Sequence, residues 1–321
     1  MKASVRYKYG SPDGVQLVDM EKPTPNESEV LVKVHAASIN SYDWRFVRAV
    51  PFLVRTSVGL FKPQDPGLGA DFSGIVEAVG SKVTMFKPGD EVFGEVRSGA
   101  YTEYVCAPED ALAHKPNNVS FEEAAAAPMA ALTALQGLRD TGKIQSGQKV
   151  LINGASGGVG TFAVMIAKYY GAEVTGVCST RNMDMVRSIG ADHVIDYTKE
   201  DFTKNGKQYD LIYDVAASRS IFDYKRVLAP NGKFVMAGFS TMPHMIHILS
   251  LGSLLASKGQ QIGMMNTAEV KSDDLAFIAE LLGSRKVVPV IDKVYPLSET
   301  AKALWHFEKE HARGKIIIKV A

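Results

Sequence analysis

The chain has 321 residues, of which 46% are hydrophobic and 22% are charged, a balance typical of a folded protein that is too long for one core. Its 36 Lys and Arg residues nearly equal its 35 Asp and Glu residues, so no overall field attracts nucleic acid or an anionic membrane. Only two cysteines occur, Cys106 and Cys178, which excludes a disulfide framework and a cysteine-built zinc site. We therefore expect two domains in a reducing, cytoplasmic setting, with no nucleic-acid and no membrane partner.

The first part of the chain, to about residue 124, is rich in short β-like runs separated by turn signals. These runs are SVRYKY, VLVKVHAASI, FSGIVEAVG, DEVFGEV and TEYVCAP. Such spacing is typical of a compact, barrel-like β domain. The opening MKASVRYKYG alternates like a strand and lacks the apolar centre of a signal peptide, so we expect no export.

From Phe121 the pattern changes. The run EEAAAAPMAALTALQGLRD, residues 122–140, is rich in strong helix formers and predicts one helix that leads into a second domain. After it, apolar strands such as VLING, EVTGVCS, HVIDY and YDLIYDV alternate with helical segments. This alternation indicates a parallel sheet covered on both faces, and hence a doubly wound α/β domain.

Two later segments need separate interpretation. Residues 236–256 are long and apolar enough to raise a membrane span, but Pro243, His244 and His247 interrupt them. A strand end followed by an amphipathic helix is the simpler prediction. The last fifty or so residues show a helix, a strand, a helix and a strand, which we expect to rejoin the first domain.

The segment KVLINGASGGVG, residues 149–160, places a glycine-rich turn directly after an apolar strand. Small residues between Gly154 and Gly160 allow a sharp turn into a helix, whose N-terminal N–H groups can approach a pyrophosphate. Further strand–helix units follow, which is the context that a dinucleotide-binding motif requires. We expect cofactor contacts from Ala155, Ser156, Gly157, Gly158, Val159 and Gly160.

The end of the next strand indicates which dinucleotide binds. In NAD-binding domains an acidic residue there holds the ribose 2′-hydroxyl, whereas this chain has VCSTRN at 177–182. Arg181 can form charge-assisted hydrogen bonds with a 2′-phosphate, and Ser179 can donate one more. These residues predict NADP(H), while Asp184 lies close enough in sequence to leave NAD as an alternative.

Together these segments resemble the medium-chain dehydrogenase/reductase superfamily, in particular its zinc-independent branch of quinone oxidoreductases and alkenal/enone reductases. The resemblance rests on GADFSGIVEAVG, FKPGDEVFG, GAYTEYVCAP, AAAAPMAALTALQGL, INGASGGVG, GADHVIDY and GKIIIKV. It implies a GroES-like β-barrel catalytic domain, 1–124 completed by 268–321, and a Rossmann NADP-binding domain, 125–267. It also implies a cofactor bound between these domains and a homodimer.

Zinc-dependent members of the superfamily have three ligand positions that can be compared with this chain. They correspond to Asn40, to Ala70-Asp71 and to Met129, which cannot supply the three N or S donors of a zinc site. The cysteine-rich lobe that holds structural zinc is also missing around residues 96–101. We therefore expect no metal, and a zinc-type alcohol dehydrogenase is the disfavoured alternative.

The run NSYDWR, residues 40–45, resembles the Asn-x-x-Asp motif of the branch, in the Asp-Trp-Lys version of plant-type enone reductases. The resemblance puts Asn40 beside the nicotinamide, gives Asp43 an ordering role in the loop, and puts the basic residue on the substrate carbonyl. Arg45 replaces the lysine here, and a guanidinium polarises a carbonyl but gives up no proton at ordinary pH. The proton would come from Tyr42 or from solvent, and simple packing is the alternative role of Tyr42.

The resemblance implies further cofactor contacts. Tyr197 in VIDY matches a tyrosine near the 2′-phosphate, with a half-buried strand-end aromatic as the alternative. Thr133 falls at the start of the helix before the cofactor domain, where relatives contact the nicotinamide ribose or phosphate. We also expect contacts from Gly238, Phe239, Met265 and Lys315.

The predicted function is hydride transfer from NADPH to a small, hydrophobic, electron-poor substrate, either a quinone or an α,β-unsaturated carbonyl. The apolar run at residues 46–66 would cap the acceptor pocket or pack in the core. A nucleotide-binding regulatory protein that senses NADPH with little turnover is the alternative from another functional class.

Overall fold

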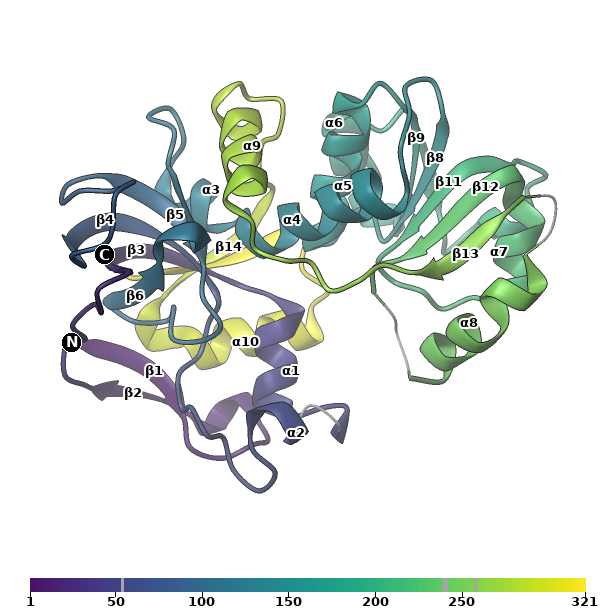
Figure 1. Cartoon of the computed structure of the whole chain (residues 1–321). Coiled ribbons are helices and arrows are strands. Elements are labelled where there is room, and N and C mark those ends of the chain that lie inside the picture. The colour runs from purple at the N-terminus through teal and green to yellow at the C-terminus, as the bar shows by residue number, and fades with distance from the viewer. Residues whose placement is uncertain (53–54, 239–241, 257–258) are drawn as a thin grey trace. The chain divides into compact units, whose positions relative to one another are not determined.

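The computed structural model describes residues 1–321 except 53–54, 239–241 and 257–258. The chain divides into two compact units, which we call unit 1 (residues 1–132 and 269–321) and unit 2 (residues 133–268) (Figure 1). The sequence pattern placed the first boundary somewhat earlier, after residue 124. Each unit has its own sheet and its own core.

Unit 1 is built around a seven-stranded sheet with the order β14-β15-β3-β4-β5-β7, and β6 pairs with β3 outside this path. The pairs are antiparallel except β14 with β15. A separate two-stranded sheet joins β1 and β2. The bounds are β1 (Lys2–Arg6), β2 (Val15–Asp19), β3 (Glu29–Ile39), β4 (Asp71–Val79), β5 (Glu91–Glu95), β6 (Tyr104–Pro108), β7 (Leu112–His114), β14 (Ile291–Pro296) and β15 (Lys315–Lys319).

The core of unit 1 follows from the alternation of apolar residues along these strands. Val30, Val32 and Val34 of β3 are buried against Phe72 and Val76 of β4. The helices of unit 1 are α1 (Ser41–Arg48), α2 (Arg55–Val58), α3 (Phe121–Ala125), α9 (Ser272–Gly283) and α10 (Thr300–Lys309). The late segment that forms β14 and β15 thus completes a sheet begun by β3.

The prediction of a single helix over residues 122–140 is wrong. A capping box begins α3, in which Ser120 and Glu123 each accept the other's backbone N–H. Pro128 then starts a new helix, α4 (Pro128–Gln136), followed by a π-helical turn at Gly137–Thr141. The helix is interrupted because proline lacks an N–H and disfavours helical backbone in the residue before it.

Unit 2 contains a six-stranded parallel sheet with the order β10-β9-β8-β11-β12-β13. Counted along the chain this is 3-2-1-4-5-6, the doubly wound dinucleotide-binding order. The strands are β8 (Lys149–Asn153), β9 (Glu173–Cys178), β10 (His193–Asp196), β11 (Tyr209–Asp214), β12 (Leu228–Met236) and β13 (Gln261–Met264). This confirms the predicted α/β fold class.

The described helices that cover the sheet of unit 2 are α5 (Gly158–Tyr169), α6 (Met183–Ser188), α7 (Ile221–Val227) and α8 (Met242–Leu255). In Figure 1, α5 and α6 lie beside β8 and β9, and α7 and α8 lie by β12 and β13. The core includes Leu151, Val177 and Ile212. Within the described residues, no helix has the length and hydropathy needed to cross a membrane, α8 included.

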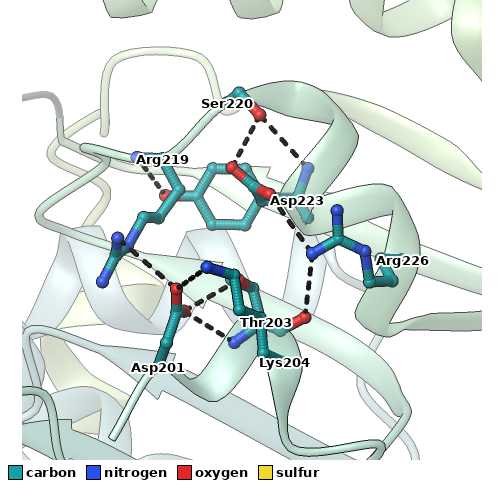
Figure 2. A network of polar contacts seen from close by, with 8 residues as sticks. Asp201, Thr203, Lys204, Arg219, Ser220, Asp223 and Arg226 are labelled. Carbon is teal, nitrogen blue, oxygen red and sulfur yellow. Dashed lines mark hydrogen bonds and ion pairs between the residues drawn. The ribbon is translucent and has the colours of Figure 1, made fainter. Parts of the chain in front are cut away.

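A polar network fixes the segments that follow β10 and β11 (Figure 2). Asp201 accepts from Thr203 N at 3.1 Å and Thr203 Oγ1 at 2.7 Å, and lies 3.7 Å from Arg219 Nη1. Ser220 Oγ donates to Asp223 Oδ2 at 2.7 Å and accepts from Asp223 N at 3.3 Å, which caps α7. The last residues of the loop before α7 are therefore fixed by an ion pair and by a helix cap.

Candidate functional site

The turn between β8 and α5 has the backbone geometry that its glycines allow. Gly154 has φ +81°, in the left-handed region. A Cβ on Gly160 would lie 2.0 Å from the Gly154 carbonyl oxygen, whereas at Gly157 the nearest atom would be 3.6 Å away. Among the residues that the structure describes, no side chain caps the N-terminus of α5, so its first N–H groups can bind an anion.

The carboxyl ends of β9 and β10 bring three predicted site residues to one edge of the sheet. Cys178 pairs in register with Asp196, so the residues that follow them, Ser179 and Tyr197, leave the sheet side by side. Tyr197 is 54% exposed, and Arg181 on the same loop as Ser179 is exposed too. This edge offers a hydroxyl, a guanidinium and a phenol.

Two carboxylates lie near this edge, and both have partners. Asp196 accepts from the Thr180 hydroxyl, from Thr198 N at 3.0 Å and from Thr198 Oγ1 at 2.7 Å. The hydrogen bond from Thr180, followed by that from Thr198, lowers the pKa of Asp196 to about 2. Asp184, the residue that kept NAD as an alternative cofactor, forms an exposed ion pair with Arg187 at 3.1 Å.

Sequence analysis missed the role of Asn182 at this edge. Its side chain is 4% exposed, and its Nδ2 donates to Ser156 Oγ at 3.1 Å and to Ser179 Oγ at 3.2 Å. The asparagine thus connects the glycine turn to the end of β9. No local pattern indicates this contact, because the two serines belong to different βα turns.

Two other predicted cofactor residues lie on α4 and directly after β13. The prediction that Thr133 starts a helix is wrong. Pro128 begins α4, so Thr133 lies in the second half of that helix. The Thr133 carbonyl accepts from Tyr213 OH at 2.9 Å, and this hydroxyl also lies 3.7 Å from Met265 Sδ. Met265 is only 6% exposed, so its thioether mainly packs against Tyr213.

The strand order reverses between β8 and β11, the position where doubly wound sheets bind ligands. There Asn153 Nδ2 donates to Asp214 Oδ1 at 2.9 Å, and burial raises the pKa of Asp214 to about 6. Gly238, just after β12, packs closely against the backbone that follows β11. A Cβ on Gly238 would lie 2.4 Å from the Val215 carbonyl oxygen. Phe239, also predicted to contact the cofactor, lies outside the described residues.

In unit 1, the sheet gathers polar side chains on one face of four neighbouring strands. Ile317 of β15 pairs with Ser38 of β3, Ser38 pairs with Asp71 of β4, and Asp71 pairs with Glu95 of β5. Directly opposed residues share a face of the sheet. Lys315 precedes Ile317 by two positions and therefore lies on the same face.

Asp71 is the centre of this cluster and is 0% exposed. Its Oδ2 accepts from Asn40 Nδ2 at 2.9 Å and from Ser38 Oγ at 3.2 Å, and its Oδ1 accepts from Met129 N at 3.1 Å. The Lys315 ammonium lies 3.5 Å from Asp71 Oδ2 and also donates to Asn40 Oδ1. Burial raises the pKa of Asp71, and the four donors oppose that change by favouring the ionised form.

Burial and mutual repulsion shift the neighbouring acids. Burial raises the pKa of Asp43 to about 7, opposed by the N–H of Asn40, which donates to Asp43 Oδ2 at 2.8 Å. Burial, then the charges of Asp71 and Asp43, raise the pKa of Glu95 to about 8. Burial lowers the pKa of Lys315, and Asp71 opposes that change most strongly. Sequence analysis missed Glu95, because only the strand register brings it opposite Asp71.

The remaining residues of the Asn40 motif lie on α1. The Tyr42 hydroxyl donates to the Arg97 carbonyl oxygen at 3.1 Å, and the Tyr42 ring packs on Phe46 with centroids 4.1 Å apart. Burial raises the pKa of Tyr42. Arg45 is half-buried, and burial lowers its pKa. Because the Tyr42 hydroxyl donates to the Arg97 carbonyl oxygen, its hydrogen is already engaged.

The apolar run that was predicted to cap a pocket or pack in the core includes residues 53–54, which lie outside the described residues. Around them, Phe52 is 62% exposed and Phe61 is 89% exposed. The Arg55 guanidinium lies 5.2 Å from the Phe52 ring centroid. These aromatic side chains do not pack in the core of unit 1.

The three positions compared with zinc ligands do lie together, since Asp71 bonds both Asn40 and the backbone of Met129. They do not fit zinc, because an amide, a thioether and one carboxylate are a poor donor set and a lysine ammonium is bound among them. Across the part of the chain that the structure describes, no group of three or more His, Cys, Asp and Glu residues could hold a metal.

Two protein-family profiles match the chain. One is the alcohol dehydrogenase GroES-like domain, over residues 26–117, and the other is zinc-binding dehydrogenase, over residues 189–318. The second description names zinc, but the donor set above does not fit that metal. The first profile lies within unit 1, and the second runs from unit 2 into the last segment of unit 1.

Similar proteins cover the whole length. The chloroplast envelope quinone oxidoreductase homolog of Arabidopsis thaliana is 34% identical, over 97% of this chain and 95% of the relative. The chloroplastic NADPH-dependent alkenal/one oxidoreductase of the same plant is 32% identical, over 99% and 79%. The quinone oxidoreductase of Escherichia coli, solved in complex with NADPH, has a TM-score of 0.84 and 26% identity over 100% of both chains. This chain therefore belongs to the medium-chain dehydrogenase/reductase superfamily, in its zinc-independent quinone oxidoreductase branch.

Proposed function

We propose that this oxidoreductase uses NADPH to reduce a quinone or the carbon–carbon double bond of an α,β-unsaturated carbonyl. The observation that carries the proposal is the Lys315 ammonium bound by Asn40 and Asp71, at positions where zinc-dependent relatives hold their metal. A fixed ammonium leaves no open coordination position for an alcohol. The names of the similar quinone and alkenal/one oxidoreductases support the same acceptors.

NADPH is proposed over NADH because of the residues at the carboxyl ends of β9 and β10. Arg181 can bind a 2′-phosphate through two N–H groups, and Ser179 and Tyr197 lie at the same edge. The two acidic side chains described above are both engaged, Asp196 by Thr180 and Thr198 and Asp184 by Arg187. The N-terminus of α5 would bind the pyrophosphate.

The bound nicotinamide would supply the hydride, and the protein would orient the acceptor and stabilise the charge that develops on it. One hydrogen of the Asn40 amide is bound to Asp71, and its oxygen accepts from Lys315, so the amide has a fixed orientation. We propose that its second amide hydrogen and Arg45 donate to the carbonyl oxygen. Because the Tyr42 hydroxyl is engaged with Arg97, solvent is the proposed proton source.

The decisive assay follows NADPH consumption with a panel of quinones, enones and alkenals, with and without a chelator. We expect turnover that the chelator does not change and that falls when NADH replaces NADPH. Loss of activity with the chelator would contradict the metal-free reaction, and equal turnover with NADH would contradict the role of Arg181. Tight NADPH binding without reduction of any acceptor would favour the sensing alternative.

We also propose a cytoplasmic location and a homodimer. Both cysteines are free thiols, which suits a reducing compartment, and the dimer is what the family resemblance implies. Fractionation of cells that produce the protein would test the first point. Light scattering coupled to gel filtration would test the second, with a monomeric mass as the contradicting result.

A further inference from the structure

The Asn182 side chain joins two serines from different βα turns of unit 2. Its Nδ2 lies 3.1 Å from Ser156 Oγ and 3.2 Å from Ser179 Oγ. The Asn182 backbone N–H also donates to the Ser179 carbonyl oxygen at 2.9 Å. A buried amide therefore ties the turn before α5 to the loop after β9.

The orientation of this amide follows from what each of its ends contacts. Asn182 Oδ1 is buried and has no hydrogen-bond partner among the described residues. A reversed amide would bury an NH₂ group with two unsatisfied donors in place of one oxygen, which is less favourable. Nδ2 therefore faces the serines, and both serine oxygens act as acceptors.

A serine that accepts from Nδ2 keeps its own hydroxyl hydrogen for another partner. Ser156 and Ser179 are half-buried, so these hydrogens can reach a ligand at the carboxyl edge of the sheet. The neighbouring Thr180 hydroxyl differs, because it donates to Asp196. The contact with Asn182 thus makes the two serines hydrogen-bond donors toward the ligand side.

We propose that Asn182 is a positioning residue that holds the Ser156 and Ser179 hydroxyls as donors to a ribose 2′-phosphate, and so favours NADPH over NADH. This inference rests on the proposed NADPH site at Arg181. A phosphate has only acceptor oxygens near neutral pH and therefore needs donors. The 2′-hydroxyl of NADH both donates and accepts, so its binding depends little on the polarity of the serines.

The test is a mutant cycle on the whole protein, in which dissociation constants for NADPH, NADH and 2′,5′-ADP are measured by calorimetry. Asn182→Asp keeps the side-chain shape but accepts both serine hydrogens, which turns the donors away from the ligand. We expect a weakening of at least about tenfold for NADPH and 2′,5′-ADP and below about threefold for NADH. Asn182→Ala, without an added charge, should weaken NADPH about fivefold.

The same two substitutions are then made in a Ser156→Ala/Ser179→Ala background. Without hydroxyls to orient, Asn182→Ala should change NADPH affinity by less than about twofold, and Asn182→Asp should retain only the effect of its charge. Equal fold-changes in both backgrounds would overturn the inference, since packing or charge alone would explain them. Melting temperatures identify any variant that fails to fold. If Asn182→Asp fails to fold, the test is made with Asn182→Ala alone.

The outcome for the unaltered protein separates this inference from the proposed function. If the unaltered protein does not prefer NADPH, the proposed cofactor is wrong. If it prefers NADPH but the cycle shows no coupling between Asn182 and the serines, only the inference about Asn182 fails.

Discussion

The Lys315 ammonium lies 3.5 Å from the Asp71 carboxylate, and the two side chains are 2% and 0% exposed. They belong to strands β15 and β4, which are separated by β3 in the sheet. Removing one partner of a buried ion pair leaves the other charge without compensation. Each of the two residues therefore depends on the other for its place in the core.

Lys315→Met should lower the free energy of unfolding by about 3–5 kcal/mol, because Asp71 and the Asn40 oxygen both lose their cation. Urea denaturation followed by circular dichroism measures the loss. Lys319→Met on the same strand is the matched control, since its side chain is 57% exposed and should change stability by less than about 1 kcal/mol. Similar losses in the two variants would contradict a special role for the buried pair.

Glu95→Gln should change how stability depends on pH. The pKa of Glu95 rises on folding from 4.5 to about 8 because the carboxyl is buried. Between these values the folded protein keeps a proton that the unfolded chain has lost, so this group makes stability fall as pH rises. Glutamine removes that contribution.

The urea midpoint of Glu95→Gln should therefore exceed that of the unaltered protein by a margin that grows from pH 5.5 to pH 8.5. Asp43, whose pKa is raised to about 7, keeps a decline of the same sign in both proteins. Glu21→Gln, at an exposed position, is the control and should change the urea midpoint little. A constant margin for Glu95→Gln would show that its carboxyl is not protonated in the folded protein.

The glycine turn allows a paired test of binding against folding. Gly160→Ala would place a Cβ 2.0 Å from the Gly154 oxygen and should destabilise unit 2. In Gly157→Ala the nearest contact of the new Cβ among the described residues would be the Gly154 oxygen at 3.6 Å, and φ is −85°, so the melting temperature should stay nearly unchanged. The substitution should still weaken NADPH binding by about tenfold or more, because the methyl group would face the proposed pyrophosphate site. Unchanged affinity in folded Gly157→Ala would place the pyrophosphate elsewhere.

Arg45 and Arg48 on α1 should behave differently when each is replaced by methionine. Arg48 is bound to Glu308 at 2.7 Å and stacks near Trp305, so its loss should reduce stability. Arg45→Met should lower kcat/KM for carbonyl acceptors by about tenfold or more while NADPH affinity is retained. Steady-state kinetics with an enone and calorimetry with NADPH distinguish the two effects. Unchanged kinetics in Arg45→Met would exclude its contact with the acceptor.

The fold was predictable from the sequence wherever the local pattern of apolar residues matches the helix or strand that forms there. Apolar strands alternating with helices predicted the parallel sheet of unit 2, and the glycines at 154 and 160 predicted its turn. The helix over residues 122–140 failed because alanine-rich propensity concealed the effect of Pro128. A single proline outweighed the helix propensity of its neighbours.

The candidate site was predictable only in part, because its contacts join distant segments. The Asn40 motif and Lys315 were both identified, but their hydrogen bond depends on β15 pairing with β3. Glu95 faces Asp71 only because of strand register, and a shift of one residue would put it on the other face. One sequence does not specify register, so such neighbours stay hidden until the sheet is known.

The pairing of β15 with β3 also determines when each unit can fold during synthesis. Every strand of unit 2 lies between residues 149 and 264, so its sheet is available before β15 leaves the ribosome. The Ala36–Ile39 part of β3 must wait for Lys315–Lys319, and until then Asp71 lacks the Lys315 ammonium. Until the last strand is made, a sheet edge stays unpaired and Asp71 lacks its ion-pair partner. Unpaired edges of this kind favour misfolding and aggregation. Nascent chains stopped before residue 315 should bind chaperones through unit 1, as site-specific crosslinking can test.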